Sequence, residues 1–235
     1  MKRKIINFLV STSVIIALPL SVFAQRDAAL DSTSRLREKV LSKVDALQPV
    51  VFKSTSLGKY SWKTNIVTTV FWIGETPAGN NPTPNHQSSW DKQWARNYGG
   101  FDNPSPSARR GFTPVAFLPR QNPFYVALPY NDINKNGTKP EASRVIPWFK
   151  TTYERSGKTV LKGRWLAIRK NGKVCYAQWE DCGPFRTDHW EYVFGGERPR
   201  PNLNRGAGLD VSPAVRDFLS MGGTDVTDWK FVDFE

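Results

Sequence analysis

The stretch from Arg164 to Trp179 restricts the possible folds more than any other part of the chain. Two runs rich in β-branched and aromatic residues, Arg164–Arg169 and Val174–Trp179, flank the dipeptide Asn171-Gly172. Asn-Gly between two such runs favours a type I′ turn, because both central residues of that turn take positive φ values. The sequence therefore predicts a tight β-hairpin at this point.

Other short segments are similarly rich in β-branched and aromatic residues and are separated by Gly, Pro and Asn. Ser212-Pro213 places a good N-cap before a proline at the first helical position, which predicts a short helix over Ala214–Ser220. Short strands with few helices predict a mainly β domain, a barrel or a sandwich, rather than a parallel α/β sheet. The further strand candidates are Ile66–Ile73, Tyr125–Leu128, Val145–Phe149 and Val226–Val232.

Residues 1–24 have the parts of a bacterial-type signal peptide. A cationic start, Lys2-Arg3-Lys4, precedes the apolar run Ile5–Leu20, and Val22-Phe23-Ala24 then predicts cleavage before Gln25. The alternative, an uncleaved membrane anchor, is disfavoured because the run is shorter than the roughly 20 residues that cross a bilayer. We therefore expect a periplasmic or secreted protein with no membrane insertion after signal removal.

The rest of the chain divides into a helix-like segment and one domain. In residues 25–55, apolar side chains recur at helical spacing until Pro49 ends the pattern. Residues 56–235 are predicted to form a single domain. Within it, residues 76–123 are rich in Pro, Asn, Ser and Gly, and one helix is expected near Ser89–Asn97.

The chain is basic, with a formal net charge of +12, of which the signal peptide supplies Lys2, Arg3 and Lys4. In an exported protein this charge fits an anionic envelope polymer or surface better than nucleic acid, so no nucleic-acid partner is predicted. A charge that only keeps the protein in solution is an equally good explanation. The protein is expected to be a monomer.

Cys175 and Cys182 are the only cysteines. Export to an oxidising compartment favours a disulfide between them, and two free thiols are the alternative. The only histidines, His86 and His189, are too few for a zinc site and argue against a Ser-His-Asp triad. Residues 132–137 are similar to half of a calcium loop, but Ser143 stands where the bidentate Glu belongs. No metal and no cofactor are predicted.

Two short elements after the hairpin resemble a known family. Asp181-Cys182-Gly183-Pro184-Phe185 follows the second hairpin strand, and Leu209-Asp210-Val211-Ser212 precedes the predicted short helix. In this order and spacing they resemble the Asp-x-Gly-Pro-Phe and Asp-Leu-Ser elements of the rare lipoprotein A family of double-psi β-barrels. The resemblance covers residues 166–235 well and 66–75 and 124–132 loosely. It leaves 76–123 and 133–160 as insertions.

The resemblance implies a six-stranded double-psi β-barrel with a groove that faces polysaccharide. Relatives of that family include murein lytic transglycosylases, expansins and expansin-related endoglucanases. It implies that Asp210 is the acid in glycosidic bond cleavage, and that Glu75 is the nearest match to the second carboxylate of the endoglucanases, shifted by two residues. Tyr125-Val126-Ala127 stands where the transglycosylases have a His before a Leu-Pro turn, which departs from their pattern.

Glycoside cleavage requires a protonated carboxyl beside the leaving oxygen, and inversion adds a carboxylate about 6.5–9.5 Å away. Asp210 is the candidate acid, and its alternative role is to bond backbone amides at the turn into the helix. Asp181 either lines the same groove or only caps its own Gly-Pro turn. Aromatic side chains that could stack on sugars, or else fill the core, are Trp72, Trp90, Trp94, Tyr98, Phe101 and Trp179.

The sequence thus predicts an exported double-psi β-barrel protein that acts on cell-wall or related polysaccharide. In one reading it is a glycoside hydrolase or a peptidoglycan lytic transglycosylase with carboxylate acid/base catalysis. In the other it is a non-catalytic, expansin-like module that binds glycan or protein. Two separated carboxylates facing one open groove would favour the enzyme, and an aromatic strip with a single buried Asp would favour the module.

Overall fold

The computed structural model describes residues 59–78 and 84–234, together with Arg35. Residues 59–78 and 84–234 belong to one compact unit, Val51–Glu235, and are mainly β-structure around a closed barrel. The predicted signal peptide, 1–24, and the predicted helical segment, 25–55, lie outside the described residues except for Arg35. No helix in the described part of the chain is long and apolar enough to cross a membrane.

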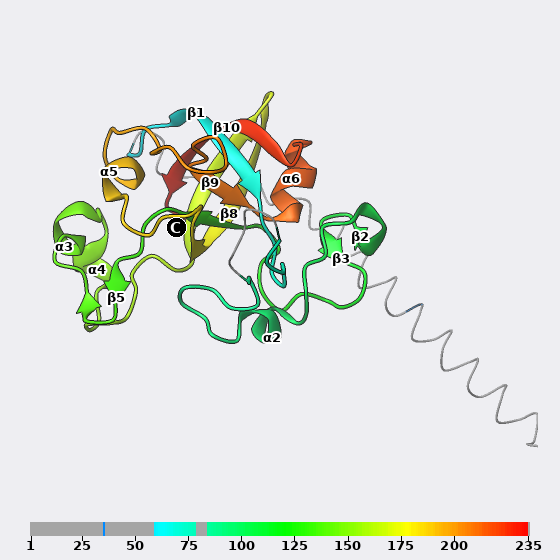
Figure 1. Ribbon diagram of the computed structural model, residues 1–235, viewed down its shortest axis with the longest axis horizontal. Helices are drawn as coiled ribbons and strands as arrows, with labels where there is room; N and C mark the ends of the chain where they lie inside the picture. The colour runs from blue at the N-terminus through cyan, green and yellow to red at the C-terminus, as the bar shows by residue number, and fades with distance from the viewer. Residues whose placement is uncertain (1–34, 36–58, 79–83, 235) are drawn as a thin grey trace, which may run out of the picture. The chain divides into compact units, whose positions relative to one another are not determined.

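Six strands close into the barrel, in which every strand is hydrogen-bonded on both sides (Figure 1). Most neighbours are antiparallel, but β1 pairs with β9 and β4 pairs with β8 in parallel. Closure removes the unpaired strand edges that an open sheet would expose. In their order around the barrel the strands are β1 (Lys63–Val70), β10 (Thr224–Val232), β7 (Arg164–Lys170), β8 (Lys173–Cys182), β4 (Tyr125–Leu128) and β9 (Leu209–Val211).

The predicted hairpin is confirmed as β7 and β8. Asn171 and Gly172 have φ values of 49° and 78°, as a type I′ turn requires, and Lys170 pairs with Lys173 across it. The predicted strand Tyr125–Leu128 has the bounds of β4, and the predicted strand Val226–Val232 lies within β10. β1 begins before Ile66 and ends at Val70, so the last three residues of the predicted strand lie beyond it.

Strands β4 and β9 separate two apolar clusters. Val126 and Leu128 on β4, with Leu209 and Val211 on β9, belong to the main core inside the barrel. The alternate β4 side chains lie on the outer face, because successive residues of a strand point to opposite sides. They form a second buried cluster with residues that follow β1 and with the first insertion: Phe71, Ile73, Trp94, Tyr98, Tyr125 and Ala127.

The first insertion contains the short helix α2 (Trp94–Tyr98), η1 (Pro106–Ala108) and the strands β2 (Arg109–Arg110) and β3 (Thr113–Pro114). Helix α2 starts later than the helix expected near Ser89–Asn97. The second insertion contains β5 (Ile133–Asn134), β6 (Gly137–Thr138), α3 (Ala142–Val145) and α4 (Phe149–Thr152).

The predicted strand Val145–Phe149 is wrong. The segment runs from the end of helix α3 to the start of helix α4, and Ile146, Trp148 and Phe149 enter the main core from these turns. A short apolar run has the same appearance in a buried strand and in a buried helical turn, so its period could not separate the two.

Helices α5 (Trp190–Val193) and α6 (Pro213–Leu219) complete the fold. The Ser212 hydroxyl accepts a hydrogen bond from Val215 N at 3.3 Å, which confirms the predicted N-cap and the proline at the first helical position. The helix ends one residue earlier than predicted, with Ser220 in the left-handed region at φ 54°.

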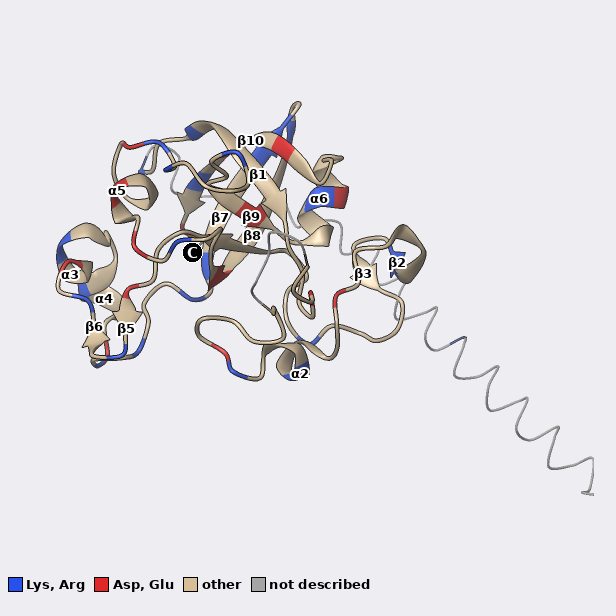
Figure 2. Ribbon diagram, in the orientation of Figure 1, with Lys and Arg blue, Asp and Glu red and all other residues tan. Residues whose placement is uncertain are grey.

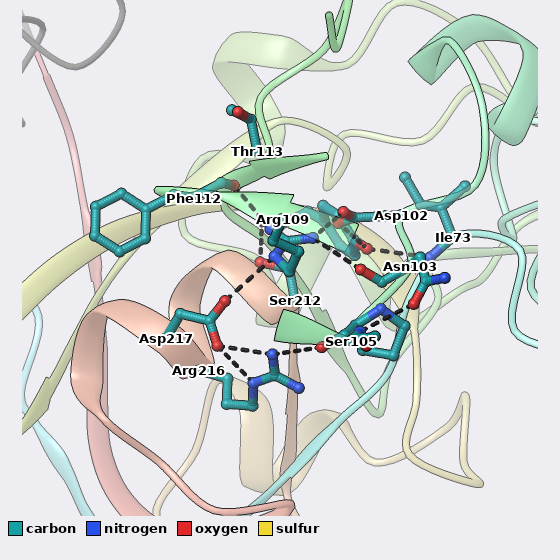
Figure 3. Close-up of polar contacts among 12 residues, drawn as sticks. Ile73, Asp102, Asn103, Ser105, Arg109, Phe112, Thr113, Ser212, Arg216 and Asp217 are labelled. Atoms are coloured by element: carbon teal, nitrogen blue, oxygen red, sulfur yellow. Dashed lines mark hydrogen bonds and ion pairs between the residues drawn. The ribbon is translucent and has the colours of Figure 1, made fainter. Parts of the chain in front are cut away.

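A buried ion-pair network attaches the first insertion to helix α6 (Figure 3). The Arg109 guanidinium lies between Asp102 and Asp217, with Nε 3.2 Å from Asp217 Oδ2, and it also donates to Phe112 O at 2.8 Å. The Tyr125 hydroxyl donates to the other oxygen of Asp102 at 2.9 Å. Through Tyr125 the network therefore reaches β4, the strand that lies at the centre of the site described next.

Candidate active site on the outer face of the barrel

Four adjacent strands bring a row of side chains together on the outer face of the barrel. Asp181 on β8 pairs with Ala127 on β4, Ala127 pairs with Asp210 on β9, and Asp210 pairs with Thr69 on β1. Directly paired residues project from the same face of a sheet. We call Asp181, Ala127, Asp210 and Thr69 the carboxylate row. Across two strand spacings of about 4.8 Å, the Asp181 and Asp210 Cα atoms are about 10 Å apart.

A β-bulge brings Asp181 into this row. Cys175, Ala177 and Trp179 alternate along β8 toward the main core, so regular alternation would send Asp181 to the inside as well. The register instead shifts between Val126 and Ala127, which pair with Trp179 and Asp181, and Glu180 becomes the additional residue. Bulges of this kind redirect a side chain. Asp181 therefore faces the same side as Ala127 and Asp210.

Asp210 is surrounded by a hydroxyl and two acids. The Thr69 hydroxyl donates a hydrogen bond to Asp210 Oδ1. Burial raises the pKa of Asp210 to about 7; the Thr69 hydrogen bond opposes this shift, and the charges of Glu75 and Asp181 add to it. The other oxygen, Oδ2, lies 3.5 Å from the position that a Cβ atom would take on Gly183. The glycine therefore leaves space beside Oδ2.

Asp181 is held by the first insertion as well as by its own strand. Its Oδ1 atom accepts hydrogen bonds from Ser89 N and from Cys182 N, both at 2.7 Å. Burial raises the pKa of Asp181, and the hydrogen bonds from Ser89 and Cys182 oppose the shift. One oxygen of Asp181 thus binds a neighbouring backbone amide on β8 and an amide of the first insertion.

Glu75 lies beyond the end of β1, where the first insertion begins. Asn85 Nδ2 donates to Glu75 Oε2 at 2.9 Å, and the backbones of these two residues are joined by a hydrogen bond from Asn85 N to Glu75 O, also at 2.9 Å. Asn85 is buried, so the packing around it fixes the position of its amide beside the Glu75 carboxylate. The Glu75 carboxylate is therefore positioned by the insertion and not by the barrel.

The row and the insertion enclose a cavity of about 470 Å³, which we call the first cavity. Glu75, Asp181 and Asp210 all line it, so the structure brings together the three carboxylates that the sequence singled out. Lys92 is the only cation among its described lining residues. The volume falls within the range of about 300–1,000 Å³ typical of small-ligand sites.

The predicted aromatic platform is mostly wrong. Trp94, Tyr98 and Trp179 are at most 1% exposed and pack in the two apolar clusters, because they cover both faces of the barrel wall. Trp72 and Trp90 are half-buried and do not line the first cavity, and the Trp90 indole N–H donates to Asn131 Oδ1 at 2.9 Å. The aromatic side chains that line the cavity are Phe71 and Phe185.

The predicted disulfide is also wrong. Both cysteines are free thiols on the same strand, β8, and they are separated by seven positions. At about 3.3 Å per residue their Cα atoms are roughly 23 Å apart, far beyond the roughly 4.4–6.8 Å of a disulfide. Cys182 lines the first cavity, and its thiol donates to Tyr130 O at 3.2 Å.

Several residues of the site were not predicted from the sequence. Thr69 and Ala127 have no chemical signal of their own and are found only through strand pairing. Asn85 and Ser89 lie in an insertion that the resemblance does not cover, and only their contacts with Glu75 and Asp181 identify them.

The arrangement can donate a proton but offers no grouped metal ligands. Within residues 59–78 and 84–234, no three His, Cys, Asp or Glu side chains are close enough to hold a metal ion. Asp132, from the calcium-like loop, instead accepts hydrogen bonds from the Thr159 hydroxyl and from Val160 N, at 2.6 and 2.9 Å. A carboxyl whose pKa is near 7 is matched to proton transfer at neutral pH.

No protein-family description matches the sequence, and no curated protein is similar enough to be called a relative.

Proposed function

We propose that this protein is an exported enzyme that cleaves cell-wall or related polysaccharide by carboxylate acid/base catalysis. The observation that carries the proposal is the first cavity, where Asp210, Asp181 and Glu75 meet and the pKa of Asp210 is raised to about 7. A buried carboxyl whose pKa is raised, lying in a cavity with other acids, is typical of catalytic sites. Two separated carboxylates in one groove also fit the enzyme better than the non-catalytic module.

Asp210 is the general acid in this proposal. Thr69 occupies Oδ1 as a hydrogen-bond donor, so the proton of the neutral acid resides on Oδ2, beside the space left by Gly183. A glycosidic oxygen placed there receives the proton as its bond to the sugar breaks. After the proton has left, the Thr69 hydroxyl stabilises the carboxylate.

Glu75 is the second carboxylate and acts as the base. It belongs to the loop after β1, whereas Asp210 belongs to the barrel row, so the two approach the first cavity from different elements. A sugar between them would have its leaving oxygen toward Asp210 and a water molecule toward Glu75, the arrangement of an inverting hydrolase. Asp181 contributes its charge, which raises the pKa of Asp210.

The finer fold assignment and the location are part of the same proposal. The two parallel strand pairs, β1 with β9 and β4 with β8, in a closed six-stranded barrel support the double-psi connection. Export is supported by the signal-like residues 1–24. N-terminal sequencing of the protein recovered from the periplasm or medium should begin at Gln25.

The test of function is to incubate the mature protein with purified peptidoglycan and with β-glucans and to identify the products by mass spectrometry. Hydrolysis adds one water molecule to each cut chain, whereas a lytic transglycosylase leaves an anhydro end with no added water. We expect hydrolysis products. Binding to these polymers without any product would identify the non-catalytic module instead, and neither binding nor product would contradict a role on these glycans.

A further inference from the structure

A second cavity continues from the first one along the protein surface. It has a volume of about 750 Å³ and is lined by residues of two loops, 185–188 and 201–203. Phe185 lines both cavities, and Asn204 follows the second loop into the first cavity. The two cavities therefore share a boundary at Phe185, one residue after the Gly183-Pro184 step beside Asp210.

Phe185 is placed in an unusual way for a large apolar residue. Its side chain is 43% exposed, and its backbone is in the left-handed region, with φ 58°, which disfavours any residue with a Cβ atom. Leu203, which lines the second cavity, is 68% exposed. Exposed apolar side chains that border a polar site are typical of a binding surface.

The wall of the second cavity is already ordered. Asn202 Oδ1 accepts hydrogen bonds from the backbone N–H groups of Asn204, Gly206 and Ala207 at 3.0, 3.1 and 3.2 Å. Its Nδ2 donates to Ala207 O at 2.8 Å. A loop that is ordered before binding loses little entropy when a ligand arrives, which favours affinity.

The charges of the two cavities restrict the ligand. The first cavity is lined by three carboxyl groups and one cation, Lys92, and every negative charge among the carboxyl groups repels an anionic chain. In the second cavity Arg186 lies 3.8 Å from Asp188, so the two charges balance each other. The pair of cavities suits an uncharged chain, although the protein as a whole is basic and its cations are spread over many elements (Figure 2).

We propose that one uncharged glycan chain occupies both cavities, with a sugar beside Asp210 in the first and a further sugar stacked on the Phe185 ring at the boundary. The inference rests on the proposed function and adds the substrate class and a binding residue. Because the stacked sugar lies beyond the cleavage position, Phe185 acts on chain binding and not on proton transfer.

The experiment measures binding of oligosaccharides of two to six sugars, from cellulose and from chitin, by calorimetry in an Asp210→Asn background that prevents cleavage. We expect affinity to rise with chain length in this background. Adding Phe185→Ala should abolish the rise and weaken binding of the longest chain roughly tenfold, the loss expected on removing one aromatic anchor. Phe185→Trp should retain the rise.

Tyr153→Ala is the matched control, because Tyr153 is 42% exposed, lies in the second insertion and lines neither cavity. Tyr153→Ala should bind the oligosaccharides as the Asp210→Asn protein does. All variants should have the melting temperature of the Asp210→Asn protein. An unchanged length dependence in Phe185→Ala would overturn the stacking role while leaving the proposed function intact. Tighter binding of polygalacturonate than of the neutral chains would overturn the uncharged class. Absence of both binding and cleavage of every glycan by the unmodified protein would refute both proposals together.

Discussion

Asp102 and Asp210 are both enclosed carboxyls whose pKa is raised by burial, but their neighbours differ. Asp102 faces the Arg109 guanidinium (Figure 3). It also accepts a hydrogen bond from the Tyr125 hydroxyl, and both contacts oppose the shift in its pKa. Asp210 has only the Thr69 hydroxyl to oppose it, and Glu75 and Asp181 add to it.

The charged neighbours of a buried acid separate a structural role from a functional one. A carboxylate with an Arg partner is compensated, and its removal leaves a buried cation behind. When the charged neighbours of a buried carboxyl group are other acids, they destabilise its ionised form. A fold would avoid this cost unless the group has another use. Asp102 holds Arg109, which joins the first insertion to helix α6 through Asp217, whereas Asp210 is available for chemistry.

The largest expected effect is that of Asp210→Asn on cleavage. The amide keeps the size of the side chain and still accepts the Thr69 hydrogen bond, but it has no acidic proton. Because general acid catalysis contributes a factor of about 10²–10⁴, the initial rate of product release should fall by that factor. The melting temperature should not fall. A variant with full activity would show that Asp210 is not the acid.

Asp102→Asn should lower stability and leave most of the activity, the opposite of Asp210→Asn. Removing one partner of a buried ion pair costs about 3–5 kcal/mol, and Asp217, which also pairs with Arg109, should keep the loss near the lower end. Urea unfolding should therefore show a loss of about 3 kcal/mol. Activity per folded molecule should fall far less than in Asp210→Asn. Equal stability of the two variants would remove the distinction between the two acids.

The stability of the protein should depend on pH through Asp210. Folding raises the pKa of Asp210 from 3.8 to about 7, so the folded protein binds this proton more tightly than the unfolded chain. The contribution of this proton to the free energy of unfolding is therefore fully present below about pH 4 and is lost as the pH rises toward about 7. Melting temperatures from pH 4 to 8 should show the unmodified protein losing stability relative to Asp210→Asn over this interval. A constant difference across the interval would mean that Asp210 titrates normally.

The smallest effect is expected from Thr69→Val. The change removes the hydroxyl that lowers the pKa of Asp210, so the pKa should move further up and the alkaline limb of the pH–activity profile should move to higher pH. Thr68→Val is the matched control, because the Thr68 hydroxyl bonds to Thr227 Oγ1 at 2.8 Å and not to Asp210. Thr68→Val should not move the alkaline limb of the pH–activity profile. If both variants move the limb equally, the effect comes from packing of β1 and not from the hydrogen bond.

Patterns confined to a few neighbouring residues were predictable. Asn171-Gly172 specified its turn, and Ser212-Pro213 specified the start of helix α6, because backbone preference and capping act over a single turn. The predictions that failed depend on contacts between residues far apart in the sequence. Val145–Phe149 needed the core to distinguish helix from strand, and the burial of Trp94 and Trp179 depends on which segments cover them.

The candidate site illustrates the same division. The sequence by itself marked Asp210, Asp181 and Glu75 as the carboxyls of interest, through the resemblance of the short motifs around them. Regular alternation along β8 would have turned Asp181 toward the core with Trp179, and no local pattern indicated the bulge at Glu180. Only the pairing of β8, β4, β9 and β1 placed Asp181, Ala127, Asp210 and Thr69 in one row, because register is set by contacts between strands distant in the chain.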